Sequence, residues 1–299
     1  MARITKATKA RSRRNSARSG RQAQAAAARV RAPLASPEPH RTPAAIVGVG
    51  ASAGGLEAFT GLLKELPSDS GLALVFAQHL APAHESMLAE ILQRATPMPV
   101  DEARDESPLE PNRVYVMPPA RTILLRDGRL RLTPRAEGQH HPIDHLFESL
   151  AATQGHRAIG VVLSGTASDG TAGLAAIKAA GGITFAQDET AMHDGMPRSA
   201  ISAGCVDFVL PPAGIARELL RIARHPYVAQ SGDADVSADQ DIDQVLDILH
   251  RSSGVDFTQY KSNTLRRRIQ RRIVLQKLTS FAEYAHFLRE NPREGEALY

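Results

Sequence analysis

The sequence is poor in cysteine and tryptophan and contains no long apolar run. Its 299 residues include one cysteine, Cys205, and no tryptophan. One cysteine excludes an internal disulfide and a zinc site built from several cysteines, and we expect it to be a small buried residue. No segment approaches the roughly 20 apolar residues of a membrane-spanning helix, and residues 1–40 lack the apolar core of a signal peptide. We therefore expect a cytoplasmic protein without membrane insertion.

Acidic residues are nearly absent from the start of the chain. Residues 1–41 hold 11 Lys and Arg against one acid, Glu38, which leaves 25 basic and 31 acidic residues in 42–299. Residues 1–43 also lack aromatic side chains and have few large apolar ones, so we expect a disordered basic tail. Such a tail can bind acidic surfaces or nucleic acid, or can be a transit peptide. We favour a solvated extension and do not expect a nucleic-acid partner.

From Ala44 onward, short apolar runs alternate with helical patterns, which is typical of parallel βαβ units. The expected strands are 44–49, 72–77, 113–116, 159–163, 183–186 and 206–209, and the expected helices are 55–65, 85–94, 143–154, 173–180 and 214–223. The Asp127-Gly128 pair predicts a hairpin between 122–125 and 129–132. These patterns predict an α/β domain over 44–226, with a doubly wound, mostly parallel sheet and one β-hairpin excursion.

The last part of the chain has a different composition. Residues 227–240 are polar and acidic and are expected to be a linker, and residues 241–299 are expected to form a small C-terminal all-α domain. Its expected helices are 241–252, 263–275 and 281–289. Three short helices are marginal as an independent core. We therefore expect this unit to be incomplete, with its remainder beyond residue 299.

A glycine-rich segment spans the end of the first expected strand and the start of the first expected helix. It contains Gly48, Gly50, Ser52, Gly54 and Gly55. Small residues at a helix start suit the phosphates of a dinucleotide, because they let the backbone approach closely. They equally suit a serine nucleophile on a sharp strand-to-helix turn. The second strand ends in Gln78-His79 rather than in the acid that would bind a ribose, which weighs against the nucleotide reading without removing it.

In the nucleophile reading, Ser52 needs a base and a carboxylate that orients the base. His79 ends the second strand, and Asp169 follows the strand at 159–163. The carboxyl ends of parallel strands share one edge of a sheet, so we expect these three side chains to meet there. Other histidines that compete for the base role are His84, His140, His141 and His193. Cys205 has no second cysteine to share a metal with, and we expect neither a metal ion nor a cofactor.

Several motifs together resemble the catalytic domain of the CheB-type chemotaxis protein-glutamate methylesterases. They are Gly50-Ala-Ser-Ala-Gly-Gly55, Gln78-His79, Gly165-x3-Asp169-Gly170 with Gly173, Ala186-Gln187 and Gly195-Met-Pro-Arg198. The resemblance implies that Ser52 is the nucleophile, His79 the general base and acid, and Asp169 the carboxylate that orients His79. That family hydrolyses γ-glutamyl methyl esters on chemoreceptor helices, and some members deamidate glutamines there.

The resemblance also implies an oxyanion site built from loop backbone at Ala53, Gly165 and Thr166. Ala53 stands where the family often has threonine, and Thr166 where many members have methionine. The first change removes a second hydroxyl and should leave the triad intact. A backbone role tolerates the second change, whereas packing against the substrate is open to it. The usual enzyme also carries a receiver domain ahead of the hydrolase, and only 43 residues precede Ala44. We therefore do not expect phosphorylation in cis to be the switch, and a separate response regulator or kinase is a candidate partner.

Residues 241–299 resemble the N-terminal helical domain of CheR-type receptor methyltransferases. The resemblance rests on Gly254-Val-Asp-Phe257, Tyr260-Lys261, Thr264-Leu265-Arg-Arg-Arg-Ile269 and Arg271-Arg272. It implies an esterase–methyltransferase fusion whose S-adenosylmethionine domain would follow residue 299. A positive helix face for acidic receptor helices is expected from Arg266, Arg267, Arg268, Arg271 and Arg272. The alternative to an enzyme is a degenerate hydrolase that serves as a scaffold in a signalling complex.

Overall fold

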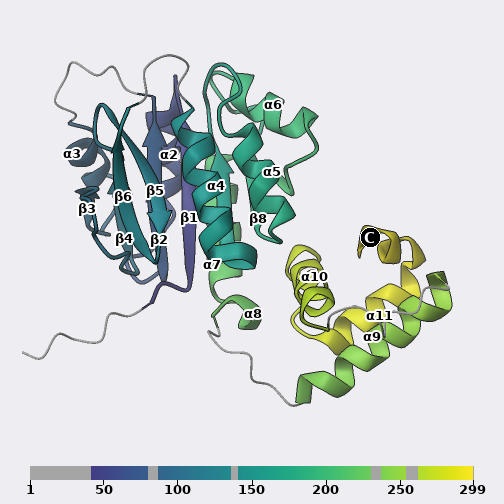
Figure 1. The fold of residues 1–299 in the computed structure, drawn as a ribbon. Helices are drawn as coiled ribbons and strands as arrows, with labels where there is room; N and C mark the ends of the chain where they lie inside the picture. Colours follow the sequence, from purple (N-terminus) through teal and green to yellow (C-terminus); the bar gives the residue numbers. More distant parts are fainter. Residues whose placement is uncertain (1–41, 80–86, 136–140, 230–236, 254–261, 299) are drawn as a thin grey trace, which may run out of the picture. The chain divides into compact units, whose positions relative to one another are not determined.

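A parallel sheet of seven strands organises the first domain. The computed structural model describes residues 42–79, 87–135, 141–229, 237–253 and 262–298 (Figure 1). The strand order is β3-β4-β2-β1-β7-β8-β9, all neighbours are parallel, and β5 pairs with β6 as a separate antiparallel hairpin. The predicted α/β class with one hairpin excursion is therefore confirmed.

The element bounds agree closely with the predicted ranges. The strands are β1 Ala45–Ala51, β2 Leu72–Gln78, β3 Val100–Glu102, β4 Arg113–Val116, β5 Arg121–Arg126, β6 Arg129–Pro134, β7 Ala158–Val162, β8 Ile183–Gln187 and β9 Phe208–Leu210. The helices of this domain are α2 Gly55–Lys64, α3 Leu88–Gln93, α4 Pro142–Gln154, α5 Thr171–Ala179, α6 Gly195–Ser202, α7 Pro212–Ala223 and α8 Pro226–Ala229. The sequence reading missed β3, α6 and α8, all of them short.

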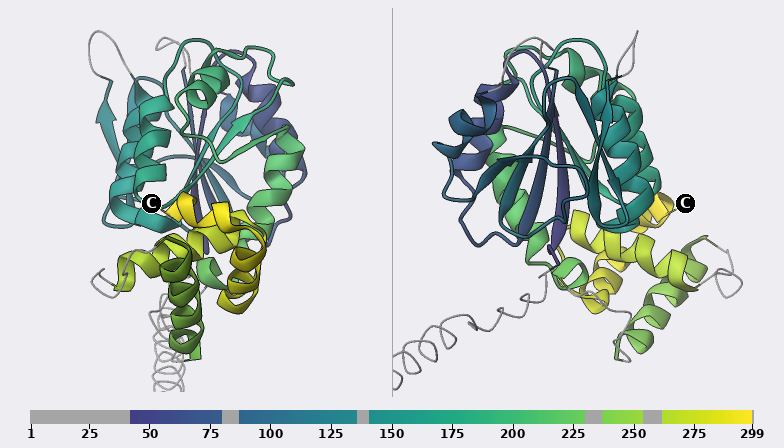
Figure 2. Two further views of the ribbon diagram at one scale, coloured as in Figure 1. Left: turned by 90° about the vertical axis from the view of Figure 1, so that its right-hand side faces the viewer. Right: turned by 60° about the vertical axis from the view of Figure 1, so that its left-hand side comes forward.

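The sheet is covered on both faces, as Figure 2 shows. One core contains buried side chains of α2, α3 and α7, and the other contains those of α4, α5, α6 and the hairpin. The alternation of β1 explains this division: Val47 and Val49 point into the first core and Ile46 into the second. Burial on both faces is the reason why these strands read as continuous apolar runs. Cys205 lies in the second core and is 3% exposed, as predicted.

Gly48 and Gly50 lie within β1, where they admit helix α4. A Cβ on Gly50 would collide with the side chain of Ile143, and one on Gly48 would lie 2.9 Å from Phe147 Cε1. The structure therefore uses these two glycines for close helix–sheet packing. This finding removes the main support for the dinucleotide reading, because only the glycines after β1 remain in the loop.

The packing at Gly50 predicts a large difference between two glycine substitutions. We expect Gly50→Ala to lower the free energy of unfolding by about 1 to 3 kcal/mol, the usual cost of an overpacked core. The control is Gly61→Ala in helix α2, where the nearest atom to an added Cβ is 3.7 Å away. We expect that change to be neutral or stabilising, because alanine is the better helix former. Urea denaturation checks both, and equal stabilities for the two variants would contradict this packing.

Helices after the sheet domain form a third apolar core. They are α9 Ser237–Ser253, α10 Ser262–Leu275, α11 Phe281–Glu290 and the 3-10 helix η3 Pro292–Leu298. Their buried side chains include Leu249, Ile269 and Tyr284. The predicted all-α unit is confirmed, although α9 begins inside the range predicted to be linker. None of the described helices is long and apolar enough to cross a membrane.

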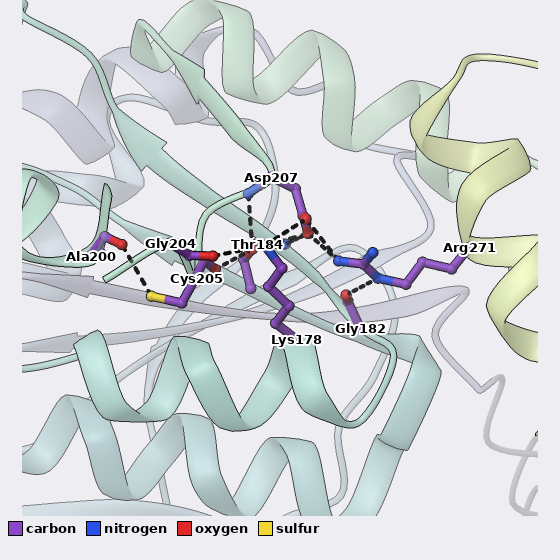
Figure 3. Close-up of polar contacts among 8 residues, drawn as sticks. All are labelled: Lys178, Gly182, Thr184, Ala200, Gly204, Cys205, Asp207 and Arg271. Carbon is purple, nitrogen blue, oxygen red and sulfur yellow. Dashed lines mark hydrogen bonds and ion pairs between the residues drawn. The ribbon is translucent and has the colours of Figure 1, made fainter. Parts of the chain in front are cut away.

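Arg271 of α10 makes a nearly buried ion pair with Asp207, the residue before β9 (Figure 3). Its Nη2 lies 2.7 Å from each carboxylate oxygen, and its Nε donates to the Gly182 carbonyl at 2.9 Å. The two side chains are 14% and 6% exposed. Asp207 also accepts from the Thr184 hydroxyl and lies 3.7 Å from Lys178 Nζ. This network joins the basic helix to the sheet domain.

Removing the Arg271 side chain leaves a buried carboxylate with one cation at longer distance. We expect Arg271→Ala to lower the free energy of unfolding by about 3 kcal/mol, since a buried charge loses its main partner. The matched control is Arg267→Ala on the same helix, because Arg267 is exposed. We expect Arg267→Ala to change the free energy of unfolding by less than about 0.5 kcal/mol. Thermal unfolding of both variants checks the expectation. An Arg271→Ala variant as stable as wild type would show that the ion pair contributes nothing to stability.

Candidate active site

Three neighbouring strands carry the three residues predicted to act together. Ser52 follows β1, His79 follows β2, and Asp169 lies in the loop after β7. Because β2, β1 and β7 are adjacent and parallel, their carboxyl ends lie side by side. In the strand order, β2 lies on one side of β1 and β7 lies on the other, so the order of the strands changes direction at β1. This is the switch point at which open α/β sheets place their ligands.

The three side chains are within hydrogen-bonding reach of one another. His79 Nδ1 lies 3.3 Å from Ser52 Oγ, and His79 Nε2 lies 2.8 Å from Asp169 Oδ2. An ionised carboxylate only accepts hydrogen bonds, so Nε2 carries the proton and Nδ1 is left to accept from the serine hydroxyl. The ring is therefore used in the opposite sense to the triads in which Nε2 faces the nucleophile.

Asp169 is held by the N-terminus of helix α4 as well as by His79. Its carboxylate is 2% exposed and accepts the N–H groups of Ile143 at 3.1 Å and Asp144 at 2.9 Å. Burial by itself raises the pKa of the Asp169 carboxyl, but the hydrogen bonds from His79, Asp144 and Ile143 outweigh burial and hold that pKa below its ordinary value. The group that faces the imidazole is therefore an anion at neutral pH.

The turn at Ser52 is shaped by glycines and by a buried serine that the sequence reading missed. Gly54 has φ +72° and is the N-cap of α2, a left-handed conformation that glycine adopts without strain. Ser164 is fully buried, and its hydroxyl donates to the Ala53 carbonyl at 2.8 Å and accepts the His193 N–H at 3.0 Å. Its carbonyl accepts the Ser52 N–H at 3.0 Å. Ser164 thus ties the nucleophile loop to two other loops.

Gln187 supports this arrangement from β8. Its Oε1 accepts the Ser164 N–H at 2.9 Å, and it is 3% exposed. The Ala186-Gln187 motif singled out this glutamine in the sequence. The motif does not show which group the side-chain amide of Gln187 contacts. A buried amide that holds the backbone beside the nucleophile fixes the loop in one conformation.

The backbone groups predicted for the oxyanion site differ in availability. The Gly165 N–H donates to the His193 carbonyl at 2.9 Å, so it is already used. Within the described part of the chain, the N–H groups of Ala53 and Thr166 have no recorded acceptor. Gly165 is still essential in shape, because an added Cβ would lie 2.9 Å from Ser52 Cβ and would collide with Met196. Its contribution is close packing rather than an open N–H.

A shallow depression opens beside the triad histidine. It is lined by Gln78, His79, Met117, Pro118, Arg121 and Arg135, among others, and has about 250 Å³ of free space that merges with solvent. Gln78 donates through Nε2 to the Ser52 carbonyl at 3.2 Å, and its Oε1 is buried without a hydrogen-bond donor among the described residues. A substrate N–H would satisfy that oxygen.

Among the residues that the structure describes, no other histidine takes the base position. His84 and His140 lie outside the described residues. His193 contributes backbone groups, as described above, and His141 Nδ1 lies 3.8 Å from Asp169 Oδ1. His141, Asp144 and Asp169 are near enough to one another to hold a cation, but the carboxylate oxygens already accept N–H hydrogen bonds. We interpret this cluster as part of the hydrogen-bond network around Asp169.

The arginines predicted to dock receptors are mostly engaged within the chain. Arg272 pairs with Glu294 at 2.6 and 2.7 Å, and Arg268 donates to the Leu298 carbonyl at 3.1 Å. Arg266 lies over the Phe281 ring, and Arg271 binds Asp207 as described above. Receptor docking stays a prediction, for which Arg267 and Arg268 are the exposed residues of the five.

Comparison with known protein families agrees with this site. The model of the CheB methylesterase family matches residues 47–219, which is more than half of the chain. The chain belongs to the CheB methylesterase family. A second family model, the all-alpha domain of CheR methyltransferases, matches residues 240–299. Both resemblances noted in the sequence are thereby confirmed.

Relatives with curated names support the same assignment. The chain is 38% identical over 195 residues to protein-glutamate methylesterase/protein-glutamine glutaminase 3 of Myxococcus xanthus, covering 64% of this chain and 55% of that one. It is 37% identical over 239 residues to an uncharacterised 104.1 kDa protein of Rhodobacter capsulatus, covering 71% of this chain and 25% of that one. The chain thus spans about half the length of the methylesterase and a quarter of the Rhodobacter protein.

A solved structure of the family has the same fold. The catalytic domain of Thermotoga maritima CheB methylesterase superposes with a TM-score of 0.56 and 30% sequence identity. The match covers 60% of this chain and 98% of that domain. The family's catalytic domain is therefore represented almost completely in this chain.

Proposed function

We propose that the chain is a serine esterase that hydrolyses γ-glutamyl methyl esters on chemoreceptor helices. The observation that carries the proposal is the contact of Ser52 with His79 and of His79 with Asp169, at the sheet edge where ligands bind. Family membership and the names of the relatives support the choice of ester. Cleavage of a glutamine amide at the same site is chemically equivalent, with ammonia as the leaving group.

The contacts of Ser52, His79 and Asp169 support the following order of proton transfers. Ser52 Oγ attacks the ester carbonyl while His79 Nδ1 takes its proton, and Asp169 stabilises the imidazolium through Nε2–H. The N–H groups of Ala53 and Thr166 are the donors proposed for the developing oxyanion. His79 returns the proton to methanol, which leaves an acyl-enzyme. Water, deprotonated by the same nitrogen, then releases the glutamate and restores Ser52.

The proposed partners follow from this substrate. They are the cytoplasmic helices of methyl-accepting chemoreceptors and a separate response regulator or kinase. The proposal is tested by incubating the chain with receptor carrying labelled methyl esters and measuring volatile methanol. We expect release at a rate proportional to enzyme concentration. No release above the buffer rate from folded chain would overturn the esterase function and favour the scaffold alternative.

A further inference from the structure

Helices α4 and α5 cap each other at the triad carboxylate. Neither helix has a side-chain cap from its own N-cap residue, His141 or Gly170. Asp169, which precedes α5, instead accepts the two N–H groups at the start of α4. In return, Asp144 in the first turn of α4 accepts the N–H of Gly173 in the first turn of α5 at 2.7 Å. Each helix start is thus satisfied by a carboxylate from the other segment.

The packing at this junction leaves little room for adjustment. A Cβ on Gly173 would collide with Phe147 Cβ and lie 3.0 Å from the Asp144 carbonyl oxygen. A Cβ on Gly170 would lie 2.9 Å from Ile143 Cγ2. The first turns of the two helices are therefore in direct contact, and a hydrogen bond between them fixes their relative position.

We propose that Asp144 is a positioning residue of the active site, which holds Asp169 toward His79 by locking the first turn of α4 to that of α5. Without the Asp144–Gly173 hydrogen bond, the N–H groups that grip Asp169 are attached to a helix end that is free to shift. Displacement of Asp169 would move the distal nitrogen of His79 and lengthen the contact of Nδ1 with Ser52. The inference rests on the proposed Ser52 chemistry and not on the identity of the ester.

The pKa shifts of Asp144 and Asp169 agree with a structural role for Asp144 and a catalytic role for Asp169. Burial and the nearby Asp169 carboxylate raise the pKa of Asp144, although the Gly173 N–H opposes them. Among the described residues, His79 and His141 also face Asp169, and the Cys205 thiol lies near Asp144. Of the two carboxyls, Asp144 therefore takes up a proton first as pH falls, and Asp169 keeps the charge that catalysis needs.

The test compares Asp144→Ala and Asp144→Asn with a control on the same helix, Glu148→Gln, whose side chain is exposed. Two readouts are used: kcat and KM for methanol release, and the rate at which a fluorophosphonate labels Ser52. We expect Asp144→Ala to lower kcat and the labelling rate about 10- to 100-fold, with KM changed less than about threefold. The Asn variant should recover to within fivefold of wild type, because its amide oxygen can accept the Gly173 N–H. The control should match wild type.

Several results separate this inference from the proposed function. Circular dichroism confirms folding at the assay temperature, and if Asp144→Ala does not fold, the Asn variant is compared with Asp144→Leu. Labelling rates of Asp144→Ala within twofold of wild type would overturn the positioning role, whatever the ester activity. An Asn variant as slow as the Ala variant would overturn it as well. If methanol is never released but labelling depends on Asp144 as described, the inference holds and only the substrate assignment fails.

Discussion

Replacing Ser52 with alanine is expected to reduce kcat for ester hydrolysis by at least about 10⁴-fold, because no other group can form the acyl-enzyme. The folded structure should be unaffected. Among the described residues, the side chain of Ser52 makes one hydrogen bond, the 3.3 Å approach to His79, and its backbone hydrogen bonds remain in the variant. Methanol release measures the first effect, and urea denaturation measures the second.

The control for this substitution is Ser202→Ala, since Ser202 is an exposed residue at the end of α6. It should retain full activity and full stability. A Ser52→Ala variant with more than about a hundredth of wild-type kcat would assign the nucleophile to another group, because loss of a covalent nucleophile costs far more than that.

Asp169→Asn is expected to lower kcat by about 10³- to 10⁴-fold, since the amide neither stabilises the imidazolium nor fixes the proton on Nε2. It should also destabilise the fold, because the helix α4 terminus loses an anionic cap. Asp127→Asn at the exposed hairpin tip is the control, and the Asp-Gly turn accepts asparagine equally well. A variant that keeps a tenth of wild-type kcat would contradict the orienting role.

The stability loss of Asp169→Asn should depend on pH in a defined direction. The pKa of Asp169 is lowered in the folded chain, so the ionised form favours folding. This contribution is present above the ordinary carboxyl pKa of about 4 and is lost as pH falls through the lowered value. Wild type and variant should therefore differ most in urea denaturation near neutral pH and converge in acid. A constant difference down to acidic pH would assign the loss to packing instead.

The sequence predicted the triad because each member follows a strand of a parallel sheet. Apolar runs marked the strands that carry Ser52, His79 and Asp169, and strand order did not need to be known for their carboxyl ends to share an edge. The nucleotide alternative arose because Gly48 and Gly50 look like loop residues in one dimension. Only the packing of Ile143 and Phe147 shows what those glycines are for.

The features that the sequence did not predict depend on contacts between distant segments. Asp144 falls within an expected helix and in none of the motifs, and its partner Gly173 lies in another helix. The orientation of the His79 ring depends on where Ser52 and Asp169 lie around it in space. The spacing of these residues in the sequence does not give that arrangement. Charge counting also assigned Arg271 to an external partner, although the acid that binds it lies 64 positions away in the chain.

The most direct test of the triad is to identify the residue that a serine-directed fluorophosphonate modifies. The folded chain is treated with the reagent, digested and analysed by mass spectrometry, with His79→Ala treated in parallel. We predict one phosphonylated residue, Ser52, and labelling at least 100-fold slower in the histidine variant, since the hydroxyl is a weak nucleophile without its base. Modification of a different serine, or equal labelling without His79, would contradict the account.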